Sequence, residues 1–216
     1  MNPLPNTIEI IPGILEKEWS AIEQKIKIAQ TFASTIHIDI IDGIFVDNQT
    51  FLDPAPFAAY SQSLYLELHM MVKDPIQYIE PFARVGFKRF IGHIEMMADQ
   101  QAFIDAARKY GEAGLALDGP TPLEKIIIPF NAVDCFLIYT SQQVGFSGPP
   151  LLSQRLDKVQ QLRAQTDKVI EVDGGMNDAS LHHAIKAGAT RVAATSFIFS
   201  SIDPEKNYQK LLSLGK

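Results

Sequence analysis

The sequence has little cysteine and no long hydrophobic segment. Cys135 is the only cysteine in 216 residues, which rules out an intramolecular disulfide, and its apolar neighbours in residues 133–138 favour a buried, unreactive thiol. No window approaches the roughly 20 apolar residues that a membrane span needs. Residues 1–7 contain two prolines and no apolar stretch suited to a signal peptide. We therefore expect a cytoplasmic protein without a membrane segment.

The chain also lacks an excess or a cluster of positive charge. It has 19 lysines and arginines against 25 acidic residues, a formal net charge of -6, and the basic residues are scattered. A nucleic-acid partner would require a basic patch, so none is expected. Hydrophobic residues make up 46% and charged residues 20% of the chain, as in an ordinary globular protein. We expect residues 1–216 to form one domain.

Eight short runs of apolar and β-branched residues alternate with amphipathic segments. This alternation is typical of a parallel sheet covered by helices, and eight parallel strands usually close into a barrel. The predicted fold is therefore α/β, a (β/α)8 TIM barrel. The predicted strands are residues 8–12, 35–40, 64–70, 89–94, 113–117, 135–140, 169–172 and 191–194.

The segments between these runs have the spacing of helices. Apolar residues recur at helical intervals in residues 17–32 and 151–164. The dipeptides Asp74-Pro75 and Asp203-Pro204 each place a capping carboxylate before a proline, which predicts a helix start at both positions.

Polar side chains occupy the inner face of three predicted strands. Side chains alternate along a strand, so a run of isoleucines on the outer face directs His37 and Asp39 into the barrel. The same alternation directs His69 and Asp173 inward. All four lie at or near the carboxyl ends of their strands, where barrel enzymes build their active sites.

These four side chains need a compensating partner inside a barrel. An unpaired buried carboxylate costs several kcal/mol or takes up a proton. A divalent ion would compensate all four, since imidazole nitrogen and carboxylate oxygen are ligands for zinc, manganese, iron and cobalt; a hydrogen-bonded polar plug is the alternative. We interpret the four as a metal site, with zinc as the first expectation. A deeper set of inward carboxylates is expected to form structural ion pairs: Glu9, Glu67 and Glu171.

The motifs around these residues resemble those of the ribulose-phosphate 3-epimerases. The match in order and spacing runs from about residue 10 to residue 199, and the combination is highly specific, although Asp-Gly-Gly alone is not. The matching motifs include His37-Ile-Asp-Ile-Ile-Asp-Gly43, Leu68-His-Met-Met-Val72, His93-Ile-Glu95, Thr121-Pro-Leu-Glu124, Gly145-Phe146 and Glu171-Val-Asp-Gly-Gly175.

The resemblance implies a metal-dependent isomerase that inverts carbon 3 of a ketopentose 5-phosphate, interconverting D-ribulose and D-xylulose 5-phosphates. Removing a proton next to a carbonyl builds negative charge on oxygen, which a cation stabilises. Inversion also needs one group to take a proton from one face and another group to return a proton to the other. The resemblance assigns these roles to Asp39 and Asp173. It further suggests a homo-oligomer, either a dimer or a hexamer.

The resemblance also implies that loops at the carboxyl ends of the strands hold the sugar and its phosphate through backbone N–H groups and a short helix start. Two of the loops, residues 42–56 and 141–150, are unusually long and are candidates for a binding site or a lid. The expected substrate and phosphate contacts are Gly13, Met71, Gly145, Phe146, Ser147, Gly148, Gly174, Gly175, Thr195 and Ser196.

Several positions depart from the family pattern. Gly13 stands where the family has a serine, Tyr139 where it has a methionine, and Thr195-Ser196 where it has Gly-Ser. Residues 142–148 lack a proline and one glycine, and Asp118-Gly119 replaces Asn-Pro. These changes alter sugar and phosphate contacts and leave the metal ligands intact. Three alternatives therefore stay open: an epimerase of a related ketohexose 6-phosphate, a non-catalytic metal- or sugar-phosphate-binding relative, and another phosphate-binding barrel enzyme such as a decarboxylase.

Overall fold

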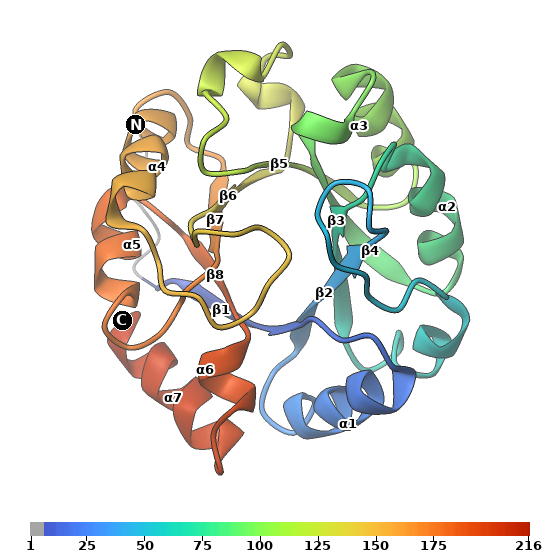
Figure 1. The fold of residues 1–216 in the computed structure, drawn as a ribbon, viewed down its shortest axis with the longest axis vertical. Helices are drawn as coiled ribbons and strands as arrows, with labels where there is room; N and C mark the ends of the chain where they lie inside the picture. The colour runs from blue at the N-terminus through green and yellow to red at the C-terminus, as the bar shows by residue number, and fades with distance from the viewer. Residues whose placement is uncertain (1–6) are drawn as a thin grey trace.

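The strands of the molecule close into a barrel. The computed structural model describes residues 7–216, and within them eight parallel strands pair in the order β1 to β8, with β8 returning to β1 (Figure 1). The predicted (β/α)8 fold is confirmed. The strands are β1 (Glu9–Ile14), β2 (Thr35–Ile41), β3 (Tyr65–Met71), β4 (Phe87–His93), β5 (Glu112–Leu117), β6 (Cys135–Tyr139), β7 (Val169–Asp173) and β8 (Arg191–Ala194).

Helices surround the barrel, because parallel neighbouring strands need a crossover between them. Among the described residues, none of the helices has the length and apolar character to cross a membrane. The α-helices are α1 (Trp19–Ala29), α2 (Ile76–Arg84), α3 (Gln100–Arg108), α4 (Leu156–Arg163), α5 (Leu181–Ala187), α6 (Ser196–Phe199) and α7 (Pro204–Leu214). Short 3₁₀ helices are η1 (Ala55–Ala59), η2 (Ile94–Met96), η3 (Leu123–Lys125), η4 (Phe130–Ala132) and η5 (Ser153–Arg155).

One of the two predicted helix caps is present. The Asp203 carboxylate accepts a hydrogen bond from the Lys206 N–H at 3.0 Å and caps α7 as expected. The helix start predicted at Asp74-Pro75 is confirmed, because α2 begins at Ile76. The Asp74 carboxylate does not cap it, however, because the Asp74 backbone has a φ of 52° and α2 begins without a side-chain cap. A capping residue needs an extended backbone, which the left-handed conformation of Asp74 does not provide.

The two predicted helices are shorter than expected. The segment 17–32 contains α1, which starts at Trp19 because the Glu18 backbone is extended. In the segment 151–164, the 3₁₀ helix η5 precedes α4. The chain there is held by a bridge between Ser141 and Leu151, so the regular helix begins only at Leu156.

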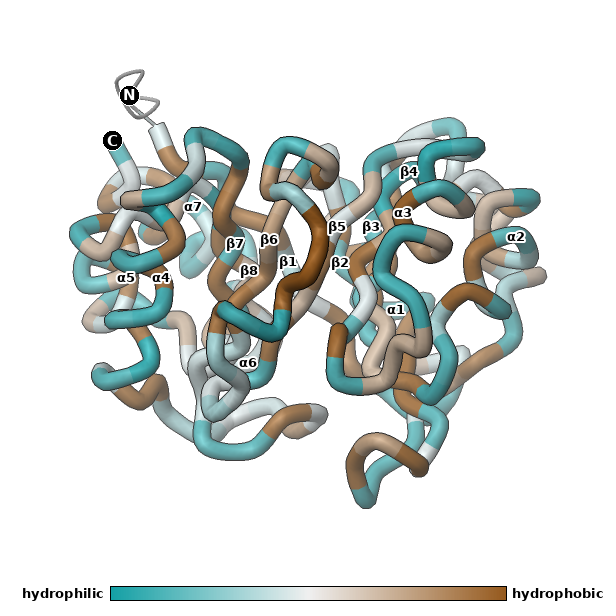
Figure 2. Tube along the Cα trace, turned by 90° about the horizontal axis from the view of Figure 1, so that it is seen from above, coloured by the Kyte–Doolittle hydropathy of each residue, from teal (hydrophilic) through white to brown (hydrophobic). Residues whose placement is uncertain are grey.

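The barrel wall separates an outer apolar layer from a mixed interior. The outward side chains of β2, including Ile36 and Ile38, are buried under the helices. Figure 2 shows the strands as mainly hydrophobic segments inside a shell in which hydrophilic segments alternate. A smaller apolar cluster inside the barrel includes Ile91 of β4, Ala116 of β5 and Leu137 of β6. The polar sector of the interior is formed by buried polar side chains of β2, β3, β4, β7 and β8.

An ionic layer fills the amino-terminal half of this polar sector. The Arg89 guanidinium donates to Glu67 at 2.5 Å and to Glu112 at 2.7 Å. Arg191 donates to Glu9 at 2.6 Å and lies 3.6 Å from Glu171. The expected ion pairs of the three deeper glutamates are thus present. They compensate the buried charges of Glu67 and Glu171, whereas Glu9 is partly exposed to solvent.

We expect Arg89→Met to lower the free energy of unfolding by about 3–5 kcal/mol, because it leaves the fully buried Glu67 carboxylate short of a partner. Arg108→Met is the matched control, since Arg108 pairs with Asp134 on the surface and such pairs contribute about 1 kcal/mol or less. Urea unfolding of both metal-free variants measures the difference. Equal losses in the two variants would contradict the structural importance of the ionic layer.

Candidate metal centre

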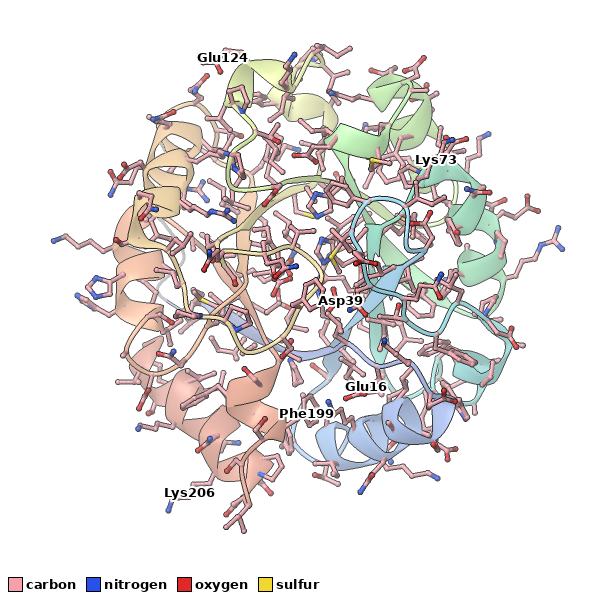
Figure 3. The ribbon with its side chains drawn as sticks, in the orientation of Figure 1. Glu16, Asp39, Lys73, Glu124, Phe199 and Lys206 are labelled. Carbon is pink, nitrogen blue, oxygen red and sulfur yellow. The ribbon has the colours of Figure 1, made fainter. Side chains whose placement is uncertain are left out.

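Four side chains from three strands converge at the carboxyl end of the barrel. Strand pairing places Asp39 beside His69, and all four predicted ligands are buried, with exposed fractions of 7% or less. Figure 3 shows Asp39 near the middle of the barrel, among side chains that point inward from several strands. The predicted convergence of His37, Asp39, His69 and Asp173 is confirmed.

The spacing of the ligand atoms suits a single ion. His69 Nδ1 lies 2.8 Å from Asp39 Oδ1 and 3.6 Å from Asp173 Oδ2. His37 Nε2 lies 3.2 Å from Asp39 Oδ1 and 4.0 Å from Asp173 Oδ2. Tetrahedral coordination with bonds of about 2.0–2.2 Å separates ligand atoms by about 3.4 Å. Two imidazole nitrogens and two carboxylate oxygens at these distances can hold a divalent ion.

The two aspartates differ in their electrostatic surroundings. Burial alone would raise the pKa of Asp39, but the charge and hydrogen bond of His37, with those of His69, lower it to about 2. Burial and the nearby Asp39 charge raise the pKa of Asp173 to about 6. In the protein without an ion, Asp39 is therefore ionised at neutral pH, whereas Asp173 takes up a proton only slightly below it. Environments that separate two carboxyl groups in this way are typical of acid/base pairs.

His37 is oriented from below by a carboxylate of the ionic layer. Its Nδ1 lies 2.5 Å from Glu67 Oε1, which leaves Nε2 directed at the other ligands. Burial would lower the pKa of His37, but Asp39, Glu171 and Glu67 raise it well above its usual value. Sequence reasoning assigned Glu67 only to ion pairs. Its register opposite His37 on the neighbouring strand is the signal that points to this second role.

A third buried histidine, His93, was not predicted as part of the site. Its Nε2 lies 3.0 Å from His69 Nε2, on the side of His69 that faces away from the aspartates. Burial and the neighbouring His69 lower the pKa of His93, although Glu95 opposes the shift. Alternation along β4 from the inward Arg89 and Ile91 would have placed His93 inside the barrel.

A pocket above the four ligands contains most of the expected substrate contacts. Its free volume is about 20 Å³, so the loops over it are closed to about the size of one water molecule. Tyr139, not predicted as a contact, also lines it. Eight of the ten predicted contacts line this pocket together with Asp39 and Asp173: Met71, Phe146, Ser147, Gly148, Gly174, Gly175, Thr195 and Ser196.

The other two predicted contacts do not line the pocket, and each has a steric reason to be glycine. A Cβ at Gly13 would lie 2.4 Å from Thr195 Oγ1, so the threonine occupies the space that a side chain at residue 13 would need. Gly145 has a φ of 79°, and a Cβ there would lie 2.6 Å from Val46. Gly13 and Thr195 thus share one space, which is filled by the side chain of the residue after β8 instead of a side chain from β1.

The loop after β6 lines the pocket and contacts the loop after β2. The loops after β2 and after β6 lie in front of the barrel in Figure 1. The Asn48 amide donates to the Gly145 carbonyl at 2.7 Å and joins them. The Tyr139 hydroxyl is 2.9 Å from the carbonyl oxygen of Gln143 and 3.1 Å from that of Phe146, and it supports the second loop from inside the barrel. A free volume of about 20 Å³ is smaller than a sugar phosphate, so we expect the loop after β6 to move when one binds.

The sequence matches known proteins along most of its length. The model of the ribulose-phosphate 3 epimerase family matches residues 9–199. The ribulose-phosphate 3-epimerase of Chlamydia muridarum is 32% identical, covering 96% of this chain and 95% of its own. That of Bacillus subtilis is 31% identical over 92% of this chain and 95% of its own.

Solved structures support the fold at much lower identity. A KGPDC from Streptococcus mutans in complex with D-R5P has a TM-score of 0.75 and 12% identity, covering 97% of each chain. The 3-keto-L-gulonate-6-phosphate decarboxylase of Vibrio cholerae has a TM-score of 0.71 and 13% identity, covering 98% of this chain and 97% of its own. At these identities the likeness extends to the barrel fold alone.

We expect chelator-treated protein to bind one divalent ion per chain and to unfold at a higher temperature once zinc is restored, since an ion bound only by the folded state stabilises it. His69→Ala should weaken zinc binding by more than about 100-fold. This loss exceeds the roughly 10- to 100-fold that is typical when a residue hydrogen-bonded to a metal ligand is removed. His182→Ala, in an exposed position on α5, is the control and should bind normally. Competition titration with a chromophoric chelator gives the affinities. Equal affinity in both variants would exclude His69 as a ligand.

Proposed function

The chain belongs to the ribulose-phosphate 3-epimerase family, and from this premise we propose that it inverts carbon 3 of a ketose phosphate, interconverting D-ribulose 5-phosphate and D-xylulose 5-phosphate. The observation that carries the proposal is the pair Asp39 and Asp173, which meet with two histidines under a pocket. A purely structural polar plug would not need four such groups from three strands at one level beside a pocket.

The four ligands His37, Asp39, His69 and Asp173 would hold one divalent ion, with zinc first and iron, manganese or cobalt also fitting the donor set. When bound, such an ion supplies positive charge beside the substrate oxygen that becomes negative during the reaction. The histidines contribute neutral nitrogen ligands. The aspartates offset the ion's charge and remain available for proton transfer.

The two aspartates divide the proton transfers between them. Carbon 3 of the substrate would lie between their carboxyl groups. In one direction, ionised Asp39 takes the proton from carbon 3, and the electron pair of the broken C–H bond moves toward the carbonyl. Protonated Asp173 then donates a proton to the opposite face, so the configuration inverts. Asp39 ends protonated and Asp173 ionised, and the reverse reaction starts from that state. Each transfer is typically worth about 10²- to 10⁴-fold in rate.

Backbone groups of the loops after β6 to β8 would hold the phosphate. Gly148, Gly174 and Gly175 all have positive φ values, of 111°, 97° and 78°, and line the pocket with Ser196. Successive residues of this kind turn backbone N–H groups toward one point. The Thr195 hydroxyl is proposed to contact the sugar, since its side chain lines the same pocket.

We expect Asp173→Asn to keep the fold and most of the ion affinity but to lose at least about 10²- to 10⁴-fold in turnover, because an amide cannot transfer the proton. The assay adds ribulose 5-phosphate in D₂O to metal-free protein, restores zinc, manganese, iron or cobalt, and follows deuterium at carbon 3 by NMR. The matched control is Asp178→Asn, because Asp178 is a partly exposed aspartate paired with Lys210 away from the pocket lining; this variant should exchange at the normal rate. A near-normal rate in Asp173→Asn would remove that residue from the acid/base role.

The same assay separates the alternatives. Exchange with a ketohexose 6-phosphate but not with ribulose 5-phosphate would change the proposed substrate. Absence of exchange with every ketose phosphate and every metal would favour a binding protein without turnover.

We expect a double-mutant cycle at Gly13 and Thr195 to be strongly non-additive, because the two positions share one space. Gly13→Ser alone should lower both thermal stability and kcat/KM through the clash with the threonine. Thr195→Gly alone should raise KM by removing the hydroxyl. The combination of Gly13→Ser and Thr195→Gly should regain KM to within a few-fold of the original. Additive losses in the double variant would show that the positions do not compensate.

A further inference from the structure

His69 is connected, on its far side, to a buried chain of hydrogen bonds. His69 Nε2 lies 3.0 Å from His93 Nε2, and His93 Nδ1 lies 3.1 Å from Glu95 Oε2. The other oxygen of Glu95 accepts the Asp118 N–H at 2.8 Å. The chain therefore runs from the candidate metal centre, across β4, to the backbone at the end of β5.

With an ion on His69 Nδ1, the contacts assign the position of each proton along this chain. His69 Nδ1 faces the two aspartates, so it must keep its lone pair free if it is to bind an ion. Its proton then lies on Nε2 and is donated to His93 Nε2. His93 must accept at that nitrogen, so its own proton lies on Nδ1 and is donated to Glu95. Because Glu95 receives hydrogen bonds on both oxygens, it is held as an acceptor.

We propose that His93 and Glu95 are positioning residues for the metal centre: together they hold His69 in the tautomer and ring orientation that present Nδ1 to the ion. The proposal rests on the proposed metal centre and deepens it. A metal-bound histidine usually donates its other ring N–H to a carboxylate, a carbonyl or a water. Here the carboxylate acts through a second imidazole.

The surroundings leave no room for water to replace His93. Both histidine side chains are fully buried, and their rings stack with centroids 5.1 Å apart. The Phe45 ring, from the loop after β2, covers His93 at a centroid distance of 4.9 Å. Without His93, the His69 N–H would lose its only hydrogen-bond partner among the described residues and would have no solvent in its place.

The two histidine ligands are thus oriented in different ways. His37 Nδ1 bonds directly to Glu67, a carboxylate of the ionic layer, at 2.5 Å. By contrast, His69 Nε2 contacts His93 Nε2, and the Glu95 carboxylate lies at the other nitrogen of that ring, so the ring separates His69 from the carboxylate. An intervening imidazole bridges that gap while keeping the hydrogen bonds directional.

Three variants test the proposal, with zinc affinity measured by chelator competition. His93→Phe keeps the ring and removes both nitrogens, so zinc binding should weaken by about 10- to 100-fold. His93→Gln can accept from His69 and donate to Glu95, and it should restore affinity to within about threefold of the original. Glu95→Gln can satisfy only one of its two donors through its single carbonyl oxygen, and a loss of up to about tenfold is expected. His182→Phe, an exposed histidine, is the matched control and should not change affinity.

A spectroscopic measurement separates positioning from a merely structural role. Nitrogen-15 NMR of the histidine rings in zinc-loaded protein should show His69 protonated at Nε2 and coordinated through Nδ1. In His93→Phe, the Nε2–H signal of His69 should lose the shift of a hydrogen-bonded group, or the coordinating nitrogen should switch. Unfolding of the metal-free variants checks the fold. If His93→Phe does not fold, Glu95→Gln and His93→Gln give the same NMR test.

Unchanged zinc affinity in His93→Phe, or a proton on Nδ1 of His69 in the original protein, would overturn the proposal. Failure of the original protein to bind any divalent ion would instead overturn the metal centre itself. The two failures are distinguishable, because the first leaves the ion bound by an intact set of four ligands.

Discussion

The alternation of side chains along parallel strands is the constraint from which the rest of the molecule follows. Once apolar residues at every second position of β2 pack against helices, His37 and Asp39 have no direction left except the barrel interior. Closure of the sheet then brings β3 and β7 to the same level. Four polar groups are forced together where water is scarce, and the structure must supply partners for them.

The protein supplies those partners in layers. Below the ligands, Arg89 and Arg191 neutralise glutamates that in turn orient His37. Beside the ligands, a histidine and a glutamate continue the hydrogen bonding of His69. Above them, loops close the pocket. A change in the polar sector therefore affects both stability and site geometry. The Glu67 carboxylate, for example, pairs with Arg89 and also orients the ligand His37.

Predictions from the sequence were correct where the two-residue alternation along a strand determines which way a side chain points. Sequence reasoning predicted all eight strands and the convergence of the four ligands, because a period of two is readable without knowing the neighbours. It failed at Asp74, whose N–H donates to the Met96 carbonyl at 3.1 Å; a contact from a distant loop favours a conformation that local preferences do not. The steric compensation between Gly13 and Thr195 could not be predicted from the sequence either, because it depends on the pairing of β1 with β8 that closes the barrel. His93 was predictable from the same alternation, because it follows Arg89 and Ile91 at every second position of β4.

The hydrogen bond from the Asn48 amide to the Gly145 carbonyl has a consequence for the rate of product release. Because it ties the covering loop after β2 to the one after β6, neither can swing away alone, and the two should behave as one hinged cover. The rate at which product escapes would then depend on breaking a single amide contact far from the reacting carbon. In such an arrangement, substitutions in the loops can change the turnover rate without changing the two aspartates that transfer protons.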